Sequence, residues 1–466
     1  MRVVLVNPAH TGIRPEDEEE HLGLGYLAAV ARRTGHEAVI VDGTAHRLSP
    51  ERLAALVGHR FGDAGLIGVS VIFQELIPAA MSIVSALRRG GFGGHISVGG
   101  HPPTFLYREL VRDFQGLDSV VVGEGEETFV DLLQALESGL DWAGLPGLVA
   151  ARPASGAPGP EVSATADPAD PGPPLPPTPR PLVGNLDDLP FPARDTFEVY
   201  AARSPGPRRA SILRSRGCYG NCSFCDTRAF YAASPGAAWR VRSAANVADE
   251  VEMLLRDHAV ECVRFWDDNF MGPGRRGREA AEELARELVR RGLRIPFSFE
   301  CRVTDVDPDL FGLLKEAGLN RVFLGVEAAN DRQLATYNKM VTVEDNRRAL
   351  RVLEDLGIEV TVGMIMFDPD TTMEELNANL EFLKAVFGSW AGVKKRVARP
   401  WNRLEVYAGT PIEATLREQG RLRGTYVRYE YEFSDPTVRR LYGSGSLLRR
   451  LGLPIRDALS RLRRRA

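Results

Sequence analysis

Three cysteines stand close together near the middle of the chain, Cys218, Cys222 and Cys225, with the spacing C-x3-C-x2-C. They follow the strand-like run 210–213, so they occupy the loop at a strand end. A cluster of four irons is normally held by four cysteine thiolates. Three thiolates can hold three of the irons, which leaves the fourth iron open for chemistry.

Other uses of these cysteines need partners that the sequence does not supply. Structural zinc takes four ligands, commonly from two C-x2-C pairs, and no second pair is present. Cys262 and Cys301 stand alone, each in a run expected to be a buried strand. The cysteine count of five is odd and the N-terminal run is a strand rather than a secretory leader, which argues against disulfides.

The aromatic residue before the last cysteine, Phe224, completes a pattern that resembles the cysteine motif of the radical SAM enzymes. The resemblance implies a [4Fe-4S] cluster on the three cysteines and S-adenosylmethionine (SAM) chelated to the open iron. It also implies that reductive cleavage of SAM yields a 5'-deoxyadenosyl radical, chemistry that the cofactor carries and the protein positions. A cytoplasmic location and an external electron donor such as flavodoxin or ferredoxin follow from the same resemblance.

The bulk composition is that of an ordinary soluble protein. The 466 residues are 44% hydrophobic and 26% charged, enough for two or three domains. No apolar run approaches a transmembrane span, and a net charge of −4 gives no reason to expect nucleic acid as a partner. The basic stretch 449–465 is expected to be a solvated tail or a helix at a domain edge. We expect a monomer that acts on a small molecule.

The first 150 residues alternate short apolar runs with helical patterns such as 25–31. This alternation predicts an α/β domain with a doubly wound, Rossmann-like parallel sheet. The expected strands are Val3–Val6, Ala38–Val41, Leu66–Ile72, Ile96–Gly99 and Ser119–Val122.

A Pro/Gly-rich linker and connector is expected over residues 151–200, because its composition cannot form a core. Strand–helix alternation then resumes over 201–408 and suggests a partial (β/α)6 barrel, as in radical SAM enzymes, with its chemistry at the C-terminal strand ends. Residues 409–466 are expected to form a small helical cap and a basic tail. The expected strands after the cysteine loop are Cys262–Trp266, Phe297–Arg302, Arg321–Val326, Glu359–Met366 and Arg403–Tyr407, and the expected helices are Asn246–His258, Arg278–Arg291, Asp309–Ala317, Asp345–Leu356 and Glu374–Val386.

Small residues follow the strands of the first domain, where an open parallel sheet binds its ligands and where glycine lets a ligand approach the backbone. Ser70-Val71-Ile72 is followed by 26 residues and then by Gly99-Gly100. This spacing resembles the Ser-x-Leu and Gly-Gly motifs of cobalamin-binding domains of the methionine synthase type. Together with the cysteine motif it identifies the chain as similar to the cobalamin-dependent radical SAM enzymes, of the class B methyltransferase type.

The first motif of such cobalamin domains, Asp-x-His-x-x-Gly, is absent, because Ala9 stands where the histidine would be. The resemblance therefore implies base-off cobalamin without a histidine ligand. His10 is one residue out of register, and we expect a loop or phosphate-contacting role for it rather than cobalt ligation. The residues expected to contact cobalamin are Asn7, His10, Gly12, Ser70, Gly99, Gly100, His101, Gly123 and Glu124.

Polar residues at the barrel strand ends are the candidates for holding SAM: Phe224, Asp267, Asp268, Arg302, Glu327 and Gly363. Asp267 or Asp268 can meet the amino group of SAM, although Asp-Asp-Asn is equally good turn chemistry. Arg302 suits the methionine carboxylate, because a guanidinium pairs with a carboxylate through two hydrogen bonds. Glu327 can meet the ribose or amino group. The alternative is a structural salt bridge between Arg302 and Glu327.

The main hypothesis is a cobalamin-dependent radical SAM methyltransferase that methylates an unactivated carbon. The Ala-, Arg-, Gly- and Pro-rich composition is typical of high-GC actinobacteria and points to natural-product biosynthesis. A first alternative is a cyclase, ring-contracting or oxidising enzyme with the same cofactors. A second alternative is a cobalamin-binding regulator or carrier with a vestigial cluster site.

Overall fold

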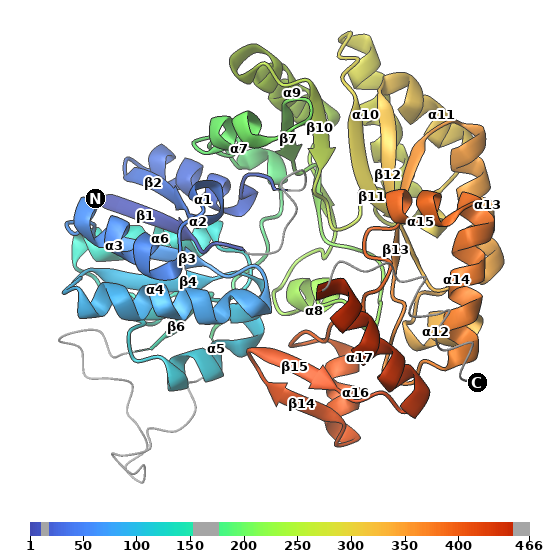
Figure 1. The fold of residues 1–466 in the computed structure, drawn as a ribbon. Helices are drawn as coiled ribbons and strands as arrows, with labels where there is room; N and C mark the ends of the chain where they lie inside the picture. The colour runs from blue at the N-terminus through green and yellow to red at the C-terminus, as the bar shows by residue number, and fades with distance from the viewer. Residues whose placement is uncertain (11–17, 152–176, 451–466) are drawn as a thin grey trace.

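A computed structural model describes residues 1–10, 18–151 and 177–450 of the chain. Two α/β domains lie side by side (Figure 1), the first drawn in blue to cyan and the second in green to orange. The C-terminal elements, drawn in red, lie next to both. Residues 11–17, 152–176 and 451–466 are outside the described residues, and so is most of the basic stretch 449–465.

The first domain is built on a six-stranded sheet with strand order β2-β1-β3-β4-β5-β6, in which only β6 is antiparallel. The five expected strands are confirmed. Because the strand order reverses between β1 and β3, the carboxyl ends of these two strands flank the point where open sheets bind ligands. The strands are Arg2–Asn7 (β1), Glu37–Asp42 (β2), Leu66–Ser70 (β3), His95–Gly99 (β4), Ser119–Val121 (β5) and Leu148–Ala150 (β6).

Helices cover both faces of this sheet, which explains why its central strands are apolar almost throughout. Residues 3–6 of β1 are fully buried. The helices are Leu22–Arg33 (α1), Gly43–His46 (α2), Pro50–Arg60 (α3), Ile77–Arg89 (α4), His101–Asp113 (α5) and Glu126–Ser138 (α6).

The second domain is a curved parallel sheet with strand order β13-β12-β11-β10-β7, and helices pack on its outer side (Figure 1). The α/β fold with this domain order is confirmed. The strands are Arg209–Ile212 (β7), Cys262–Phe265 (β10), Phe297–Arg302 (β11), Leu319–Glu327 (β12) and Glu359–Met364 (β13). The helices are Ala244–His258 (α9), Gly274–Arg290 (α10), Pro308–Ala317 (α11), Val343–Asp355 (α13) and Met373–Phe387 (α14).

The sixth barrel strand, expected at Arg403–Tyr407, does not form. Arg403 makes one isolated bridge to Phe367, and a second bridge joins Val362 to Val397. Because the pairing is split between two separate points, no continuous ladder extends beyond β13. The expectation that Cys262 is buried is also wrong, since it is only partly buried.

The C-terminal cap is not purely helical. It combines the helices Pro411–Glu418 (α16) and Pro436–Arg450 (α17) with a hairpin of Leu422–Thr425 (β14) and Arg428–Tyr431 (β15). The hairpin reaches the first domain, because the Tyr426 hydroxyl donates to Asp113 at 2.7 Å.

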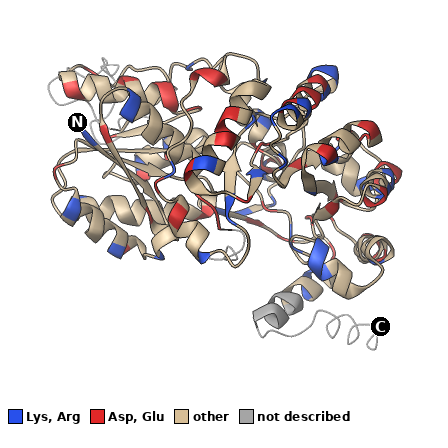
Figure 2. Cartoon of the chain, turned by 90° about the horizontal axis from the view of Figure 1, so that it is seen from above, with Lys and Arg blue, Asp and Glu red and all other residues tan. Residues whose placement is uncertain are grey.

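Charged residues of both signs are interspersed over both domains (Figure 2). Within the described residues, no helix combines the length and the apolar character needed to cross a membrane.

Candidate functional site

A cavity of about 660 Å³ lies between the two domains. One wall comes from strand ends of the first domain, including Ser70, Gly99 and Gly100, and the opposite wall includes Asp226 and Asp268 of the second domain. Its volume is in the range of cofactor and small-molecule sites. The strand ends of the first domain thus share one cavity with Asp226 and Asp268, which flank the cysteine loop in the fold, whereas the three cysteines themselves do not line it.

The part of the cavity wall that the first domain forms leaves room for a bulky ligand. Gly100 has φ +126°, and a Cβ there would lie 2.2 Å from the carbonyl oxygen of Val71, so only glycine fits. Ile72, Phe73 and Trp266 are apolar yet 40–41% exposed, and all three line the cavity. A glycine cradle with half-exposed apolar walls fits the large, partly apolar corrin ring of cobalamin.

Gly100→Ala is expected to destabilise the first domain by more than about 1 kcal/mol and to weaken cobalamin binding, because of both the positive φ and the backbone clash. Urea unfolding and spectrophotometric titration with hydroxocobalamin measure the two effects. The control is Gly93→Ala, where a Cβ meets nothing within 4 Å. If both variants had the same stability and the same affinity for hydroxocobalamin, the assignment of Gly100 to the cobalamin site would be contradicted.

His21 is a cavity residue that sequence reasoning missed, because no motif spacing marks it. Its Nδ1 accepts from the Leu24 N–H at 3.1 Å, so its Nε2 carries the proton and donates to the Ser70 hydroxyl at 2.8 Å. Burial lowers the pKa of His21, which keeps the ring neutral. The hydroxyl hydrogen of Ser70 is then left to donate to a ligand.

Asn7 at the end of β1 and His10 in the loop after it lie in the cavity wall. The Asn7 amide donates to the Asp42 carboxylate at 3.0 Å and so also serves the fold. His10 Nε2 lies 2.7 Å from the Glu75 carboxylate, and its backbone N–H donates to the Thr44 hydroxyl. Gly12 lies outside the described residues. A cobalamin contact through Asn7 or His10 stays a prediction.

Three further carboxylates, Glu18, Glu19 and Glu20, line the cavity just before α1. Glu19 lies 2.7 Å from the Arg209 guanidinium and 3.5 Å from that of Arg264, so the first domain reaches onto the barrel strands here. Sequence reasoning did not single out these residues, because an acidic run is usually a solvated surface.

Glu124, which is expected to contact cobalamin, lines the cavity, and its carboxylate also bridges the two domains. The cobalamin contact stays a prediction. The carboxylate accepts from Arg216 at 3.0 Å, from Arg240 at 2.7 Å and from the Val183 N–H at 2.8 Å. Glu126 pairs with Arg216 at 2.5 Å. We call these four charged residues the interdomain ion cluster. Burial raises the pKa of Glu124, but the two guanidiniums more than offset this and hold that pKa below its usual value.

His101 also joins the domains. Its ring stacks on Phe230 at 4.0 Å, and its Nδ1 lies 3.4 Å from the Asp226 carboxylate. Burial opposes protonation, but the hydrogen bond to Asp226 leaves the pKa of His101 raised. Since Asp226 directly follows Cys225, the Gly-Gly-His segment of the first domain contacts the cysteine loop.

The cysteine loop runs from β8 (Ser215–Arg216) to α8 (Thr227–Ala232). The Gly220 N–H donates to Cys218 Sγ at 3.3 Å, and Arg302 Nη1 donates to Cys222 Sγ at 3.1 Å. Burial raises the pKa of Cys218 and that of Cys225, the latter to about 12. These thiols therefore ionise when metal binds rather than before.

No three His, Cys, Asp or Glu side chains in the described part of the chain gather around a point that would suit a single metal ion. A four-iron cluster does not need such a point, because each cysteine ligates a different iron. The loop donors beside Cys218 and Cys222 suit thiolate ligands, so the residues fit the cluster.

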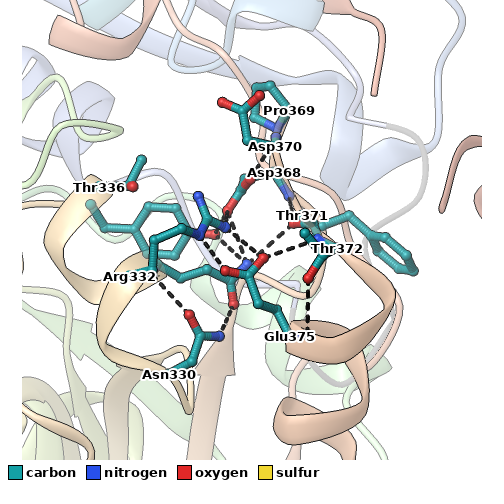
Figure 3. A network of polar contacts seen from close by, with 12 residues as sticks. Asn330, Arg332, Thr336, Asp368, Pro369, Asp370, Thr371, Thr372 and Glu375 are labelled. Atoms are coloured by element: carbon teal, nitrogen blue, oxygen red, sulfur yellow. Dashed lines mark hydrogen bonds and ion pairs between the residues drawn. The ribbon is translucent and has the colours of Figure 1, made fainter. Parts of the chain in front are cut away.

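A buried polar network surrounds Asp368 and reaches Tyr337, which contacts the cysteine loop; Figure 3 shows the network around Asp368. Asp368, 1% exposed, accepts from the Tyr337 hydroxyl at 2.8 Å and from the Gln333 amide at 2.9 Å, and Arg332 lies at 3.3 Å. The backbone carbonyl of Tyr337 accepts from the Ser223 N–H at 3.0 Å, and its ring meets that of Phe224 edge-on. Tyr337 thus packs against the loop through its contact with Phe224.

The two adjacent aspartates have different surroundings. Asp267 is buried and accepts from the Arg214 N–H at 2.8 Å and the Ser215 hydroxyl at 2.7 Å, so both oxygens support the strand before the loop. Burial raises the pKa of Asp267 to about 6. Asp268 accepts from the Gly217 N–H at 2.8 Å and lines the cavity. The contact of Asp267 or Asp268 with the SAM amino group stays a prediction, and of the two only Asp268 lines the cavity.

Arg302 and Glu327 do not pair with each other. Arg302 donates to the Lys339 carbonyl as well as to Cys222, and Glu327 instead pairs with the Lys339 ammonium at 3.1 Å. The prediction of a structural salt bridge between Arg302 and Glu327 is therefore wrong. Sequence reasoning missed Lys339 as the partner of Glu327. Arg302 Nε is buried and has no hydrogen-bond partner among the described residues, which fits a ligand still to be bound.

The backbone of Glu327 is left-handed, with φ +64°, which places a rare conformation at the end of β12. Its carboxylate lies beside Gly363, where a Cβ would stand 3.7 Å from Oε2 and 2.9 Å from the Phe323 ring. Arg302, Glu327 and Gly363 do not line the 660 Å³ cavity. They lie together on the barrel side of the cysteine loop.

Comparisons with known proteins agree with the division of the chain into two domains. The family model "Radical SAM superfamily" matches residues 212–383, and the model "B12 binding domain" matches residues 11–133.

Two curated relatives are each 27% identical to this chain. One is an uncharacterized methyltransferase of Pyrococcus horikoshii, aligned over 83% of this chain and 78% of the relative. The other is an anaerobic magnesium-protoporphyrin IX monomethyl ester cyclase of Rubrivivax gelatinosus, aligned over 94% of this chain and 74% of the relative.

A solved structure shares the whole fold. The cobalamin-dependent S-adenosylmethionine radical enzyme OxsB, with aqua-cobalamin and S-adenosylmethionine bound, superposes with a TM-score of 0.75 at 21% identity. The match covers 95% of this chain and 66% of that one, so this chain spans about two thirds of the length of OxsB.

Proposed function

We propose that the chain, which matches the radical SAM and B12-binding family models over residues 212–383 and 11–133, is a cobalamin-dependent radical SAM methyltransferase. It moves a methyl group from SAM through cobalamin to an unactivated carbon of a small molecule, in natural-product biosynthesis. A match to a named methyltransferase over 83% of the chain supports methyl transfer.

One observation carries the proposal. The 660 Å³ cavity is walled by the glycine cradle on one side and by Asp226 and Asp268 of the cysteine-loop region on the other. The cavity thus adjoins the cysteine-loop region, and a substrate held there would lie between the two cofactor domains and react without a diffusive encounter, which is the advantage of building both modules into one chain.

The cluster with SAM supplies the radical when bound, and cobalamin supplies the methyl group. Cys218, Cys222 and Cys225 hold the cluster, and the Arg302 guanidinium offsets the charge of the Cys222 thiolate. Asp268 accepts from the amino group of SAM. The free Nε of Arg302 donates to its carboxylate, and Glu327 accepts from its ribose. Gly363 leaves room for the adenine.

The first domain holds cobalamin, base-off, against Gly99, Gly100 and Gly123. The Ser70 hydroxyl, fixed by His21, donates to it. Phe73 and Trp266 exclude water from the space where the substrate sits. The enzyme works as a cytoplasmic monomer with flavodoxin or ferredoxin as its electron donor.

A second candidate is a cyclase or another enzyme that uses the same cofactors without methyl transfer. The match to the monomethyl ester cyclase over 94% of the chain favours it. The two candidates differ in their products, because only methyl transfer converts SAM to S-adenosylhomocysteine.

The deciding assay is anaerobic incubation of the reconstituted protein with methylcobalamin, dithionite and SAM, with both SAM products quantified. Deoxyadenosine together with S-adenosylhomocysteine supports the methyltransferase. Deoxyadenosine alone supports the second candidate. A protein that binds neither iron nor cobalamin would contradict both.

A further inference from the structure

The guanidinium of Arg302 lies directly against the cysteine loop. Arg302 is the last residue of β11, and its Nη1 donates to Cys222 Sγ at 3.1 Å. Gly220 leaves the space that this contact needs, because a Cβ there would stand 2.6 Å from Arg302 Nη1 and 3.4 Å from Cys218 Sγ. A side chain at position 220 would displace the guanidinium, so its contact with the loop depends on glycine.

Other contacts hold the guanidinium at this place. Its Nη2 donates to the backbone carbonyl of Lys339, and its Cζ lies 5.5 Å from the centroid of the Tyr219 ring, which belongs to the loop. The backbone N–H of Arg302 donates to the Asp305 carboxylate at 3.0 Å. Arg302 is buried, so these contacts fix its charge beside the sulfur rather than in solvent.

This buried charge has no carboxylate partner among the described residues. There the guanidinium donates to Cys222 Sγ and to the Lys339 carbonyl. The Asp305 carboxylate instead accepts from the Tyr219 hydroxyl and from the backbone of Arg302. An unpaired buried charge is costly, so this guanidinium indicates that a negative group binds beside it. A cluster held by thiolates is such a group, because one of its sulfurs already adjoins Nη1.

The charge beside the sulfur affects how readily the cluster accepts an electron. Reduction adds one negative charge to the cluster, and the reductant loses one electron, without any bond of the protein forming or breaking. Hydrogen bonds to the sulfurs and the charge around a cluster are among the features that set its reduction potential. A fixed positive charge and an N–H donor both favour the more negative, reduced form.

Resting on the proposed function, we infer that Arg302 raises the reduction potential of the [4Fe-4S] cluster by stabilising its reduced form through Cys222 Sγ. Gly220 is the positioning residue, because it admits the guanidinium to the loop. The cluster then accepts its electron from a weaker reductant than it would without this arginine. The effect is present in the absence of SAM, so it is separable from the contact of Arg302 Nε with the SAM carboxylate.

The test is a redox titration of the anaerobically reconstituted protein without SAM. Dithionite is the reductant, and electron paramagnetic resonance follows the reduced cluster. At the midpoint potential of the wild-type cluster, we expect the ratio of reduced to oxidised cluster in Arg302→Met to be about tenfold lower. This change corresponds to a midpoint about 59 mV more negative for a one-electron couple. Arg302→Lys keeps the charge but loses the planar fork, so its shift should be smaller.

Two further variants separate the position of the charge from its presence. Gly220→Ala keeps the arginine but displaces its guanidinium from the sulfur, so the midpoint should move in the same direction. This variant decides the question if Arg302→Met does not retain iron. Arg264→Met is the matched control, because the Arg264 guanidinium on β10 faces Glu19 at 3.5 Å and Glu300 at 3.4 Å instead of a sulfur. Its midpoint should be unchanged.

An unchanged midpoint in iron-loaded Arg302→Met or Gly220→Ala, or an equal shift in Arg264→Met, would overturn the role of Arg302. A wild-type protein that binds no iron would overturn the proposed function instead, so the two failures are distinguishable.

Discussion

Cys222→Ala is expected to abolish deoxyadenosine formation, with the product falling to background. The substitution removes one of three thiolates and leaves the Arg302 guanidinium without its sulfur partner. A cluster held by only two cysteines is unstable, and SAM then has no iron to chelate. Iron content, the visible absorption of the reconstituted protein and product chromatography measure the effect.

Cys262→Ala is the matched control, because Cys262 is a partly buried cysteine on β10, outside the loop. It should retain both the iron and the product. Full deoxyadenosine formation by the Cys222 variant, or an equal loss of iron in the control, would contradict the assignment of the cluster to the loop.

Arg216→Met is expected to lower the free energy of unfolding by about 3–5 kcal/mol, because it leaves two buried carboxylates short of their partner. Arg216 is 10% exposed, while Glu124 and Glu126 are 7% and 8% exposed. Urea unfolding followed by circular dichroism measures the loss. Cobalamin affinity should fall as well, since the same residue joins the first domain to the cysteine loop.

Arg275→Met serves as the control, because its pair with Glu279 is on the surface, with the arginine 88% exposed. Such a pair contributes at most about 0.5 kcal/mol. If both variants lost the same stability, the interdomain ion cluster would have no special role.

The stability difference between wild type and Arg216→Met also depends on pH. The folded-state pKa of Glu124 is depressed below 4.5, because Arg216 and Arg240 outweigh the effect of burial. A depressed acid pKa stabilises the fold above the unfolded value, and this contribution is lost as pH falls through the folded value. The difference should therefore shrink below about pH 4.5 and stay constant near neutrality.

The types and spacing of residues in the sequence were enough to predict the cluster loop, the two α/β domains and the cobalamin-binding edge. The cysteine spacing identifies the cluster loop, because three ligands in eight residues have few other uses. Apolar runs alternating with helical patterns predict two α/β domains, because buried parallel strands must be apolar on both faces. The Ser70 and Gly100 positions mark the cobalamin edge, because both stand at carboxyl ends of strands.

Only the tertiary structure decided which charged groups meet. Glu124 is 92 positions from Arg216 in sequence, and nothing in its own motif indicates that it pairs with a guanidinium of the second domain. Asp267 and Asp268 are neighbours of one type, yet burial assigns one to the fold and the other to the cavity. His21 and Lys339 carry no motif, and their roles appear only once Ser70 and Glu327 lie beside them.

The missing sixth strand has the same cause. The run 403–407 has strand-like composition, but a strand forms only where a neighbouring edge offers a continuous ladder. Val397 pairs with Val362 inside β13, whereas Arg403 pairs with Phe367 beyond the end of β13, so no continuous ladder forms along that edge. Spacing along the chain thus determines which cofactors the protein is built for, whereas packing between distant segments determines which side chains remain to hold them.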